Sequence, residues 1–480
     1  MGGKQGRTSP VDAVDTSLRR KGKLFVTLWA LAHLVHAWHQ GSDGVEASLE
    51  DLGLIAVVVA VLVVLWRPSS TKAVASLALI QFVTFVAQMP LVANHWTIAA
   101  FANAGLIATC AARPSLLREH SGRLVSELTT FLKLIFLISY SAAAIAKLNS
   151  GFLDPVHSCA TDLMQYLGIE PAAVPLLGVA AVAVTVGVEL AVPVLLLMRR
   201  TRLLGIVLAG VFHLALAVTP AVTVMDFSLF VFALIALFAP PDVGDRLALQ
   251  VEASPIAQRL RRTSPVLRAL GGAGTAAFVL IFAIGRGPVV GGATWALVSW
   301  GVFVLVGAFV VTMGLAVLWS YRGTPAPQTP AGSHASAVPI HLVGLLALLV
   351  LNAASPYLGG KTTSSFTMFS NLRTEGMESN HVLIPRLPIE TMQDDLVRIS
   401  TSSNPVLQRH AEDGNLLAYH EVRRTLRTDP TASVDLERAG EQLSYEDASE
   451  DPELTSLSFA SRKLFHFRPV NETGPPICQP

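Results

Sequence analysis

Charge and cysteine are both scarce in this sequence. Only 14% of its 480 residues are charged, whereas soluble domains average about a quarter. Its three cysteines are too few for a disulfide-dense scaffold or a cysteine-rich zinc site. The net charge of +1 gives no indication of nucleic-acid binding. We therefore expect neither a nucleic-acid-binding protein nor a small secreted disulfide-rich domain.

Long stretches of strand-like alternation are also missing, and continuous apolar runs take their place. Examples are residues 52–66, 174–198 and 203–218. A helix needs about 17–25 apolar residues to cross a bilayer, and a membrane barrel would alternate instead. The basic residues before the first apolar run are not followed by a small-residue cleavage site, so this run is predicted to be a helix and not a signal peptide. The composition predicts an all-α polytopic bundle in contact with membrane lipids.

The apolar pattern predicts eleven transmembrane helices. Lysine and arginine gather in alternate loops, and the short loops on the other side hold only Arg286. Because cytoplasmic loops are rich in these residues, the N-terminus is predicted to be cytoplasmic and the C-terminus extracytoplasmic. The predicted parts are a cytoplasmic segment (1–23), a transmembrane domain (24–354) and an outer domain (355–480). The predicted spans are approximately residues 24–40, 50–66, 73–90, 95–112, 125–148, 174–198, 202–219, 223–239, 268–285, 293–319 and 338–354.

The polar C-terminal part is predicted to be a small β-rich domain. Short β-like runs cover residues 364–371, 381–386 and 457–467, and a helical pattern covers 416–426. Cys478 lies in this part, and Cys159 lies in a long loop on the same predicted side. An oxidising compartment is consistent with either a disulfide between them or two free thiols.

Polar residues inside the predicted spans are the first candidates for function, because each is costly in lipid. Lys147 lies near the outer end of the span 125–148, and Tyr140 lies seven residues earlier on the same helix face. Desolvation favours a neutral amine, which can act as a base. The alternative is a lysine that extends its ammonium group to the membrane surface. Glu189, inside 174–198, needs a cationic or donating partner, or a proton.

Several histidines are also candidates. His95 lies between Asn94 and Trp96 at the start of the span 95–112, and the alternative role is an interfacial anchor. His213 lies inside the span 202–219, where it could instead donate to a backbone carbonyl. His33 and His36 could share a helix face as metal ligands. No cysteine or carboxylate accompanies them in that span, so no metal site is predicted.

Several of these residues lie in motifs that resemble a known family. Residues 140–149 with Gly151-Phe152-Leu153 resemble the lysine-bearing segment of the vitamin K-dependent gamma-glutamyl carboxylases. They also resemble the bacterial relatives of these enzymes, the horizontally transferred transmembrane domain (HTTM) proteins. The pairs Asn94-His95 and Phe212-His213 match two further motifs. Residues 366–373, with Asn380-His381 after them, match the segment behind the family's last span. The resemblance covers approximately residues 20–385.

The resemblance implies a specific chemistry. Lys147 would be the base that deprotonates a reduced quinone of the vitamin K hydroquinone type, and His95 would stabilise charge on the glutamyl centre. Oxygen and carbon dioxide would be co-substrates, and the substrate would be a glutamate-containing peptide or protein on the outer face. Supporting roles are predicted for Asn94, Tyr140, Glu189, His213 and His381.

Two departures from the family pattern keep other functions open. Ala146 precedes Lys147 where the animal enzymes have a second lysine, and a short tail replaces their large lumenal domain. The alternative is a non-catalytic quinone- or lipid-binding membrane module whose tail recruits a partner. A third hypothesis is that the protein is a transporter, and the lack of a visible internal repeat argues against it.

Overall fold

The chain forms two compact units in a computed structural model, and each is described by itself. The structure describes residues 10–40, 49–165, 175–217, 224–240, 243–245, 247 and 337–478. The first unit comprises residues 1–84, 99–136 and 194–346, and the second comprises 85–98, 137–193 and 347–480. The predicted spans 268–285 and 293–319 lie outside the described residues.

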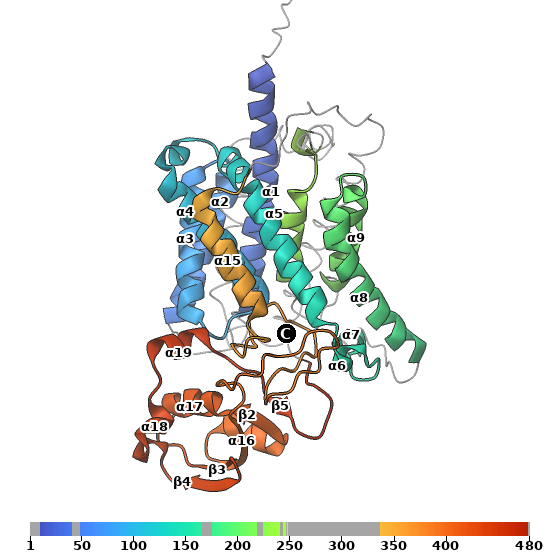
Figure 1. Cartoon of the computed structure of the whole chain (residues 1–480). Coiled ribbons are helices and arrows are strands. Elements are labelled where there is room, and N and C mark those ends of the chain that lie inside the picture. Colours follow the sequence, from blue (N-terminus) through green and yellow to red (C-terminus); the bar gives the residue numbers. More distant parts are fainter. Residues whose placement is uncertain are drawn as a thin grey trace, which may run out of the picture. The chain divides into compact units, whose positions relative to one another are not determined.

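The other nine predicted spans all coincide with helices in the described part of the chain. They match the predictions to within a few residues at most ends, although α1 begins well before residue 24 (Figure 1). The helices are α1 (Pro10–Gln40), α2 (Leu49–Trp66), α3 (Thr71–Gln88), α4 (Asn94–Ala112), α5 (Ser121–Ala146), α8 (Pro175–Leu197), α9 (Arg202–Ala217), α10 (Met225–Ala236) and α15 (Ile340–Ala354). Short helices η2 (Pro114–Arg118), α6 (Ser150–Leu153) and α7 (Cys159–Gln165) complete this part.

The prediction of eleven membrane spans is not supported. In the described residues, three helices are long and apolar enough to cross a membrane: Thr71–Gln88, Ser121–Ala146 and Leu176–Leu197. Four further apolar helices are only 10–17 residues long, whereas crossing a bilayer takes about 20 residues. α1 and α4 are long enough, but polar and charged residues interrupt them. The predicted spans follow the apolar runs of the sequence, and several of these runs extend past the helix ends into the connecting loops.

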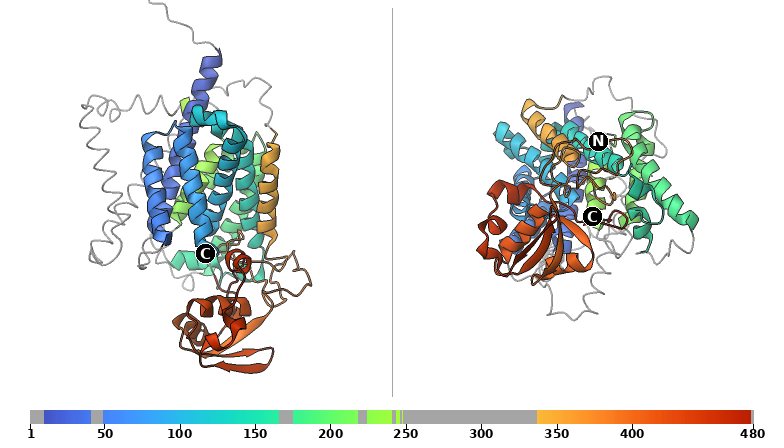
Figure 2. Two further views of the ribbon diagram at one scale, coloured as in Figure 1. Left: turned by 90° about the vertical axis from the view of Figure 1, so that its left-hand side faces the viewer. Right: turned by 60° about the horizontal axis from the view of Figure 1, so that its bottom comes forward.

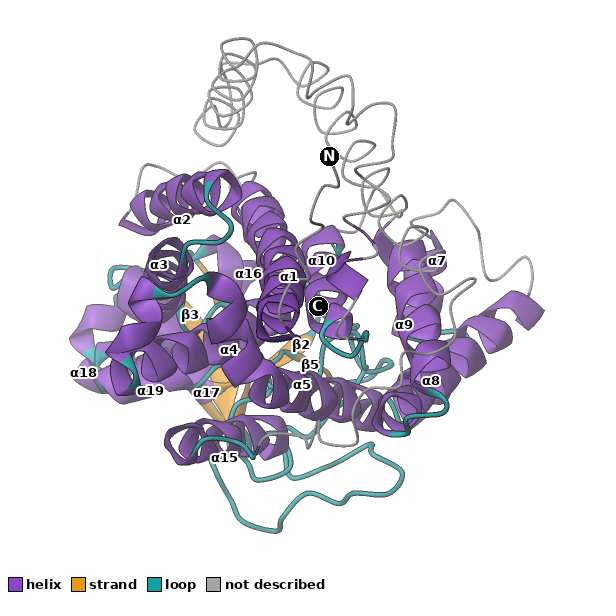
Figure 3. Ribbon diagram, turned by 90° about the horizontal axis from the view of Figure 1, so that it is seen from above, coloured by secondary structure: helices purple, strands orange, loops and turns teal. Residues whose placement is uncertain are grey.

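A buried polar network holds helices of the first unit together. α1 packs along α10 and α2, and Figure 3 shows α1 beside α10. Trp29 Nε1 donates to Asn103 Oδ1 over 3.1 Å, and Asn103 Nδ2 donates to Gln81 Oε1 over 2.8 Å. The same Nδ2 lies 3.1 Å from His33 Nε2. These side chains can lie inside apolar helices because they satisfy one another's hydrogen bonds.

A five-stranded antiparallel sheet forms most of the C-terminal part of the second unit. The strand order is β4-β3-β1-β2-β5, and Figure 2 shows these strands side by side. Its buried core includes Val397 and Ile399 from β1 and Leu436 from β3, with Val422 from a covering helix. The elements are β1 (Leu396–Ser402), α16 (Pro405–Glu412), β2 (Asn415–Ala418), α17 (Tyr419–Thr428), β3 (Val434–Arg438), β4 (Glu441–Tyr445), η4 (Ala448–Glu450), α18 (Pro452–Thr455), α19 (Phe459–Leu464) and β5 (Val470–Asn471).

The small β domain is confirmed, but its strands lie elsewhere than predicted. None of residues 364–371, 381–386 or 457–467 forms a strand of the sheet. The predicted helix 416–426 begins only at Tyr419, because Asn415–Ala418 pairs with β1 as β2. Residues 364–371 were predicted to be strand-like, but contacts outside the sheet hold this segment in an irregular conformation.

Candidate functional site

Lys147 is buried and ion-paired in the second unit. It directly follows the last residue of α5, and only 4% of it is exposed. Its Nζ lies 2.9 Å from Oε2 of Glu189 in α8. The same nitrogen lies 3.4 Å from the carbonyl oxygens of Ala143 and Met368, and 5.7 Å from the centre of the Phe152 ring. The ammonium group therefore does not extend to the surface, and Glu189 has the cationic partner that its burial requires.

Asn149 fixes the turn that positions Lys147. Its Oδ1 accepts a hydrogen bond from Phe152 N over 2.9 Å and so caps α6. Its Nδ2 donates to the carbonyl oxygens of Ala146, over 2.7 Å, and Ser370, over 2.5 Å. All the polar atoms of this side chain are thus used in holding the end of α5 against the tail. We therefore assign Asn149 a positioning role.

Residues 364–371, here called the tail strap, contact both motif regions of this unit. Asn94 Oδ1 accepts from Phe366 N over 2.5 Å, and Ser364 Oγ donates to the carbonyl oxygen of Val92. Lys147 contacts the carbonyl of Met368, two residues after Phe366. The structure thereby brings the Asn94 motif and the Lys147 motif to one short segment.

The backbone of the tail strap is strained. Ser364, Phe366, Phe369 and Asn371 have φ values of 59°, 64°, 47° and 51°. A bulky residue at positive φ is uncommon, and such a conformation costs of the order of 1–3 kcal/mol and persists only where the surroundings fix it. Four such residues in one segment indicate that the contacts of the tail strap outweigh the energetic cost of its backbone conformation.

His95 is buried in the first turn of α4. It is 7% exposed, and the neighbouring Asn94 and Trp96 are 2% and 1% exposed. Trp96 Nε1 donates to Gln88 Oε1 over 2.9 Å. The pair His95-Trp96 is therefore enclosed by protein, which argues against a role as a lipid-facing anchor. Tyr140, two turns before Lys147, is also buried, at 6% exposed.

His381 caps the end of α5. Its Nε2 donates to the carbonyl oxygen of Ile145 over 2.9 Å. Its Nδ1 accepts from the backbone N–H groups of Leu383 and Ile384, over 3.0 and 2.9 Å. This arrangement requires a neutral ring, and burial lowers the pKa of His381 from its ordinary value. We therefore assign His381 a positioning role.

His213 and the α1 histidines belong to the first unit. The His213 ring packs edge to face against Phe227, with 5.0 Å between ring centres. His33 Nδ1 donates to the Trp29 carbonyl over 2.7 Å, and its Nε2 is occupied by the polar network described above. His36 Nδ1 lies 2.8 Å from Oδ2 of Asp226. Because His33 has no ring nitrogen left, it cannot join His36 in binding a metal ion.

A second, half-buried lysine was not identified from the sequence. Burial lowers the pKa of Lys361 to about 8. This lysine lies in the polar tail, three residues before the tail strap, where a charged residue gives no sign of burial from sequence. It is a second candidate base in this unit and a necessary comparison for Lys147.

Two of the three cysteines, Cys159 and Cys478, form a disulfide. Cys159 and Cys478 are bonded across 319 residues of sequence. Cys159 packs in a small apolar cluster with Phe152, Ala160 and Val182. Of the two alternatives that the sequence left open, the disulfide is the one that forms.

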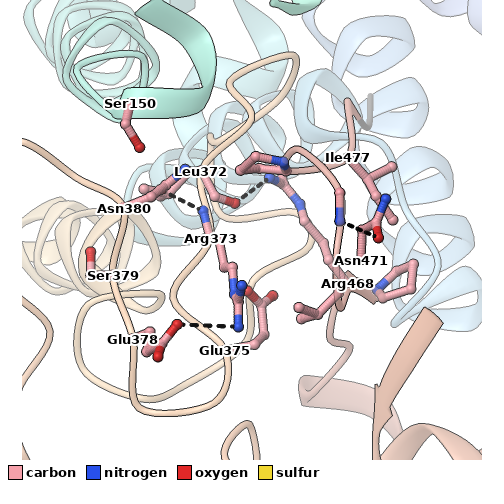
Figure 4. A pocket seen from close by; sticks show the side chains of 14 residues that line it. Ser150, Leu372, Arg373, Glu375, Glu378, Ser379, Asn380, Arg468, Asn471 and Ile477 are labelled. Atoms are coloured by element: carbon pink, nitrogen blue, oxygen red, sulfur yellow. Dashed lines mark hydrogen bonds and ion pairs between the residues drawn. The ribbon is translucent and has the colours of Figure 1, made fainter. Parts of the chain in front are cut away.

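A cavity of about 260 Å³ lies beside the turn that carries Asn149. It is lined by Ser150 and by loops at 372–380 and 468–477, and Figure 4 shows Arg373, Glu375, Glu378 and Arg468 among the side chains around it. Asn380 Nδ2 donates to Asn149 Oδ1 over 3.2 Å, so the cavity wall is tied to the Lys147 motif.

The cavity contains buried polar atoms that lack a partner. Arg468 is 5% exposed and Glu375 is 2% exposed. Within the described residues, Arg468 Nε and Glu375 Oε1 make no hydrogen bond. Arg373 is paired with Glu378 over 3.4 Å. The residues around the cavity thus carry charges of both signs, while these two atoms are themselves enclosed by protein. Sequence reasoning missed it because its lining comes from loops far apart in the chain.

No family model, curated protein or solved structure matches this chain. The carboxylase-like resemblance therefore stays a prediction from the motifs, and the function is argued from the site.

Proposed function

We propose that this chain is a carboxylase-like membrane enzyme in which Lys147 acts as the base toward a reduced quinone. The observation that carries the proposal is the enclosed Lys147–Glu189 pair, held at the end of α5 by the tail strap. A structural ion pair needs no such strained segment beside it.

The pair gives Lys147 a route to its neutral form. Transfer of one proton from Nζ to Oε2 of Glu189, across 2.9 Å, leaves two neutral groups and no isolated buried charge. The free amine can then take a proton from an acidic hydroxyl, and the resulting ammonium stays beside the anion that it has created. Glu189 would hold the displaced proton during this step.

The surroundings of Lys147 suit a quinone ring. Phe152 places an aromatic face near Nζ, and Tyr140 is buried two turns away. When bound, the reduced quinone would supply, with oxygen, the strong base that removes a γ-proton of glutamate so that carbon dioxide can add. His95 would stabilise negative charge on the glutamyl group. These roles come from the resemblance and are proposed for this chain.

The proposal places the tail and the end of α5 on the extracytoplasmic side, with the N-terminus in the cytoplasm. The bias of lysine and arginine among the loops favours this orientation. The Cys159–Cys478 disulfide supports it, since disulfides form in oxidising compartments. The substrate would be a glutamate-containing peptide or protein on that side, and the mixed-charge cavity beside Asn149 offers a place for it.

The test measures three products with purified protein in vesicles and a reduced quinone: oxidised quinone, its epoxide, and acid-stable label from carbon dioxide on a glutamyl peptide. Lys147→Met is expected to lower the rate about 10²–10⁴-fold, as loss of a general base does. Lys463→Met, in α19, is the matched control and should keep full activity.

Lys361→Met decides between the two lysines that are candidate bases. If it abolishes turnover while Lys147→Met does not, the base has been assigned to the wrong residue. If both variants retain full activity, the proposed mechanism is wrong.

A non-catalytic quinone- or lipid-binding module is the second candidate. Two features favour it: Lys147 is already neutralised by Glu189, and Ala146 stands where the animal enzymes have a second lysine. This candidate predicts tight quinone binding with no oxidation. Sustained turnover by the purified protein would exclude it.

A further inference from the structure

A loop in the second unit has an apolar surface that nothing in the site explains. Residues 382–389, here called the apolar loop, read VLIPRLPI. Val382, Leu383, Leu387 and Ile389 are 59%, 71%, 44% and 59% exposed. Four large apolar side chains exposed in one short segment mark an interaction surface.

The single charge of the apolar loop is turned inward and neutralised. Arg386 is 7% exposed as a residue, and its guanidinium pairs with the buried carboxylate of Asp394. Its Nη2 also donates to Ile389 O and Thr391 Oγ1, over 2.9 and 3.1 Å. The loop therefore presents no formal charge at its surface. A loop that faces water would gain nothing from burying its charged side chain.

Five of the six backbone N–H groups of the apolar loop donate hydrogen bonds inside the protein. Leu383 N and Ile384 N both donate to Nδ1 of His381. The N–H groups of Val382, Leu387 and Ile389 donate to backbone carbonyls over 2.9, 3.1 and 2.8 Å. Pro385 and Pro388 have no N–H to satisfy. Exposed loops normally leave such groups to water, whereas a segment in lipid must pair them internally.

The ends of the apolar loop are tied to the ends of two apolar helices. Val382 N donates to the carbonyl of Leu148, just after α5. Leu387 N donates to the carbonyl of Tyr357, which follows α15 by three residues. α5 is one of the three helices long and apolar enough to span a membrane in the described part of the chain. The loop is thus tied to the end of a helix that could span a membrane.

We propose that the apolar loop inserts into the membrane leaflet next to the tail and contacts lipid acyl chains there. The inference rests on the proposed membrane placement of α5. Internal pairing of Arg386 and of five backbone N–H groups lowers the cost of insertion, and the exposed Val, Leu and Ile side chains supply the apolar contact. The occupant is lipid, and not a second protein, because the surface continues from the end of a candidate span.

The test places a fluorescent thiol label at Leu383→Cys in a Cys110→Ala background, in phosphatidylcholine vesicles with or without brominated acyl chains. Bromine quenches the label only on contact with the chains. We expect about two-fold or greater quenching at Leu383, since an inserted side chain reaches the acyl boundary. A label at Val406→Cys, on α16 and 52% exposed, is the matched aqueous control and should stay unquenched.

A third label distinguishes a failure of the loop proposal from a failure of the proposed membrane placement. Val184→Cys lies in the apolar helix α8 and is 57% exposed. Quenching at Val184 without quenching at Leu383 overturns the loop proposal alone. The absence of quenching at both positions overturns the membrane placement as well. Cross-linking of two copies of the Leu383→Cys variant through the introduced thiol would instead assign the surface to a dimer. Ile389→Cys repeats the measurement if the first variant fails to form the Cys159–Cys478 disulfide.

Discussion

At the scale of single residues, the pairing of Lys147 with Glu189 dominates the site. Both side chains are largely buried, at 5% and 13% exposed. Removing one partner of a buried pair leaves an uncompensated charge and typically costs about 3–5 kcal/mol. We expect Glu189→Leu to lower the free energy of unfolding in detergent by about this amount. The double variant Lys147→Met/Glu189→Leu should recover most of it, because no charge is then stranded.

This double-mutant cycle also tests the geometry itself. A coupling free energy near zero would show that the two groups do not interact in the folded protein. The proton-transfer route proposed for Lys147 would then have no acceptor. Activity of the single variants, measured in parallel, separates a loss of stability from a loss of chemistry.

At the scale of structural elements, His381 joins the end of α5 to the apolar loop. Burial lowers the pKa of His381 below its ordinary value of 6.5. A histidine with a depressed pKa binds fewer protons in the folded state than in the unfolded state. Its contribution to stability is therefore complete above pH 6.5 and is lost as the pH falls from 6.5 through the folded-state pKa.

We expect the backbone amides of Leu383 and Ile384 to lose protection from hydrogen exchange below pH 6.5, because a protonated ring can no longer accept their hydrogen bonds. The measurement is hydrogen exchange by mass spectrometry, corrected for the intrinsic effect of pH. His381→Asn is the control and should show low protection at every pH. Equal protection of the unaltered protein above and below pH 6.5 would contradict the assigned hydrogen bonds.

The helices could be predicted from sequence far better than the strands. An apolar run is a local property, and the nine predicted helices in the described part of the chain were found. Whether a helix can span a membrane depends on its length, and an apolar run does not show where the helix ends. The prediction of eleven spans is for this reason not supported. β1 carries only two fully buried positions, Val397 and Ile399, so its pattern is too short to stand out.

The candidate site was predictable only in part. Lys147 and Glu189 stood out because each is costly in an apolar helix, but their pairing joins two different helices and could not be read from sequence. The lining of the mixed-charge cavity was invisible for the same reason, since Arg373 and Arg468 lie in separate loops. The positive φ values of the tail strap could not be predicted either, because its strand-like sequence gives no sign of the long-range contacts that it makes.

At the scale of the whole molecule, the Cys159–Cys478 disulfide ties the end of the described chain to the segment after α5. The bond closes a loop of 319 residues, for which the chain-entropy model gives a stabilisation of about 6 kcal/mol as an upper figure. The tail end is also held there by a hydrogen bond from Asn371 Nδ2 to Pro476 O over 2.9 Å. Because Pro476 and Ile477 line the mixed-charge cavity, loss of the disulfide should loosen that cavity.

We expect Cys478→Ser to lower the unfolding midpoint and to raise KM for the peptide substrate, with kcat much less affected. The reason is that the cavity wall moves while the Lys147–Glu189 pair keeps its contacts on α5 and α8. Cys159→Ser should give the same result, and a reducing agent should produce it in the unaltered protein but not in the double serine variant. A fall in kcat at constant KM would instead place the disulfide in support of Lys147, the proposed base, and would show that the cavity is not part of the proposed substrate-binding site.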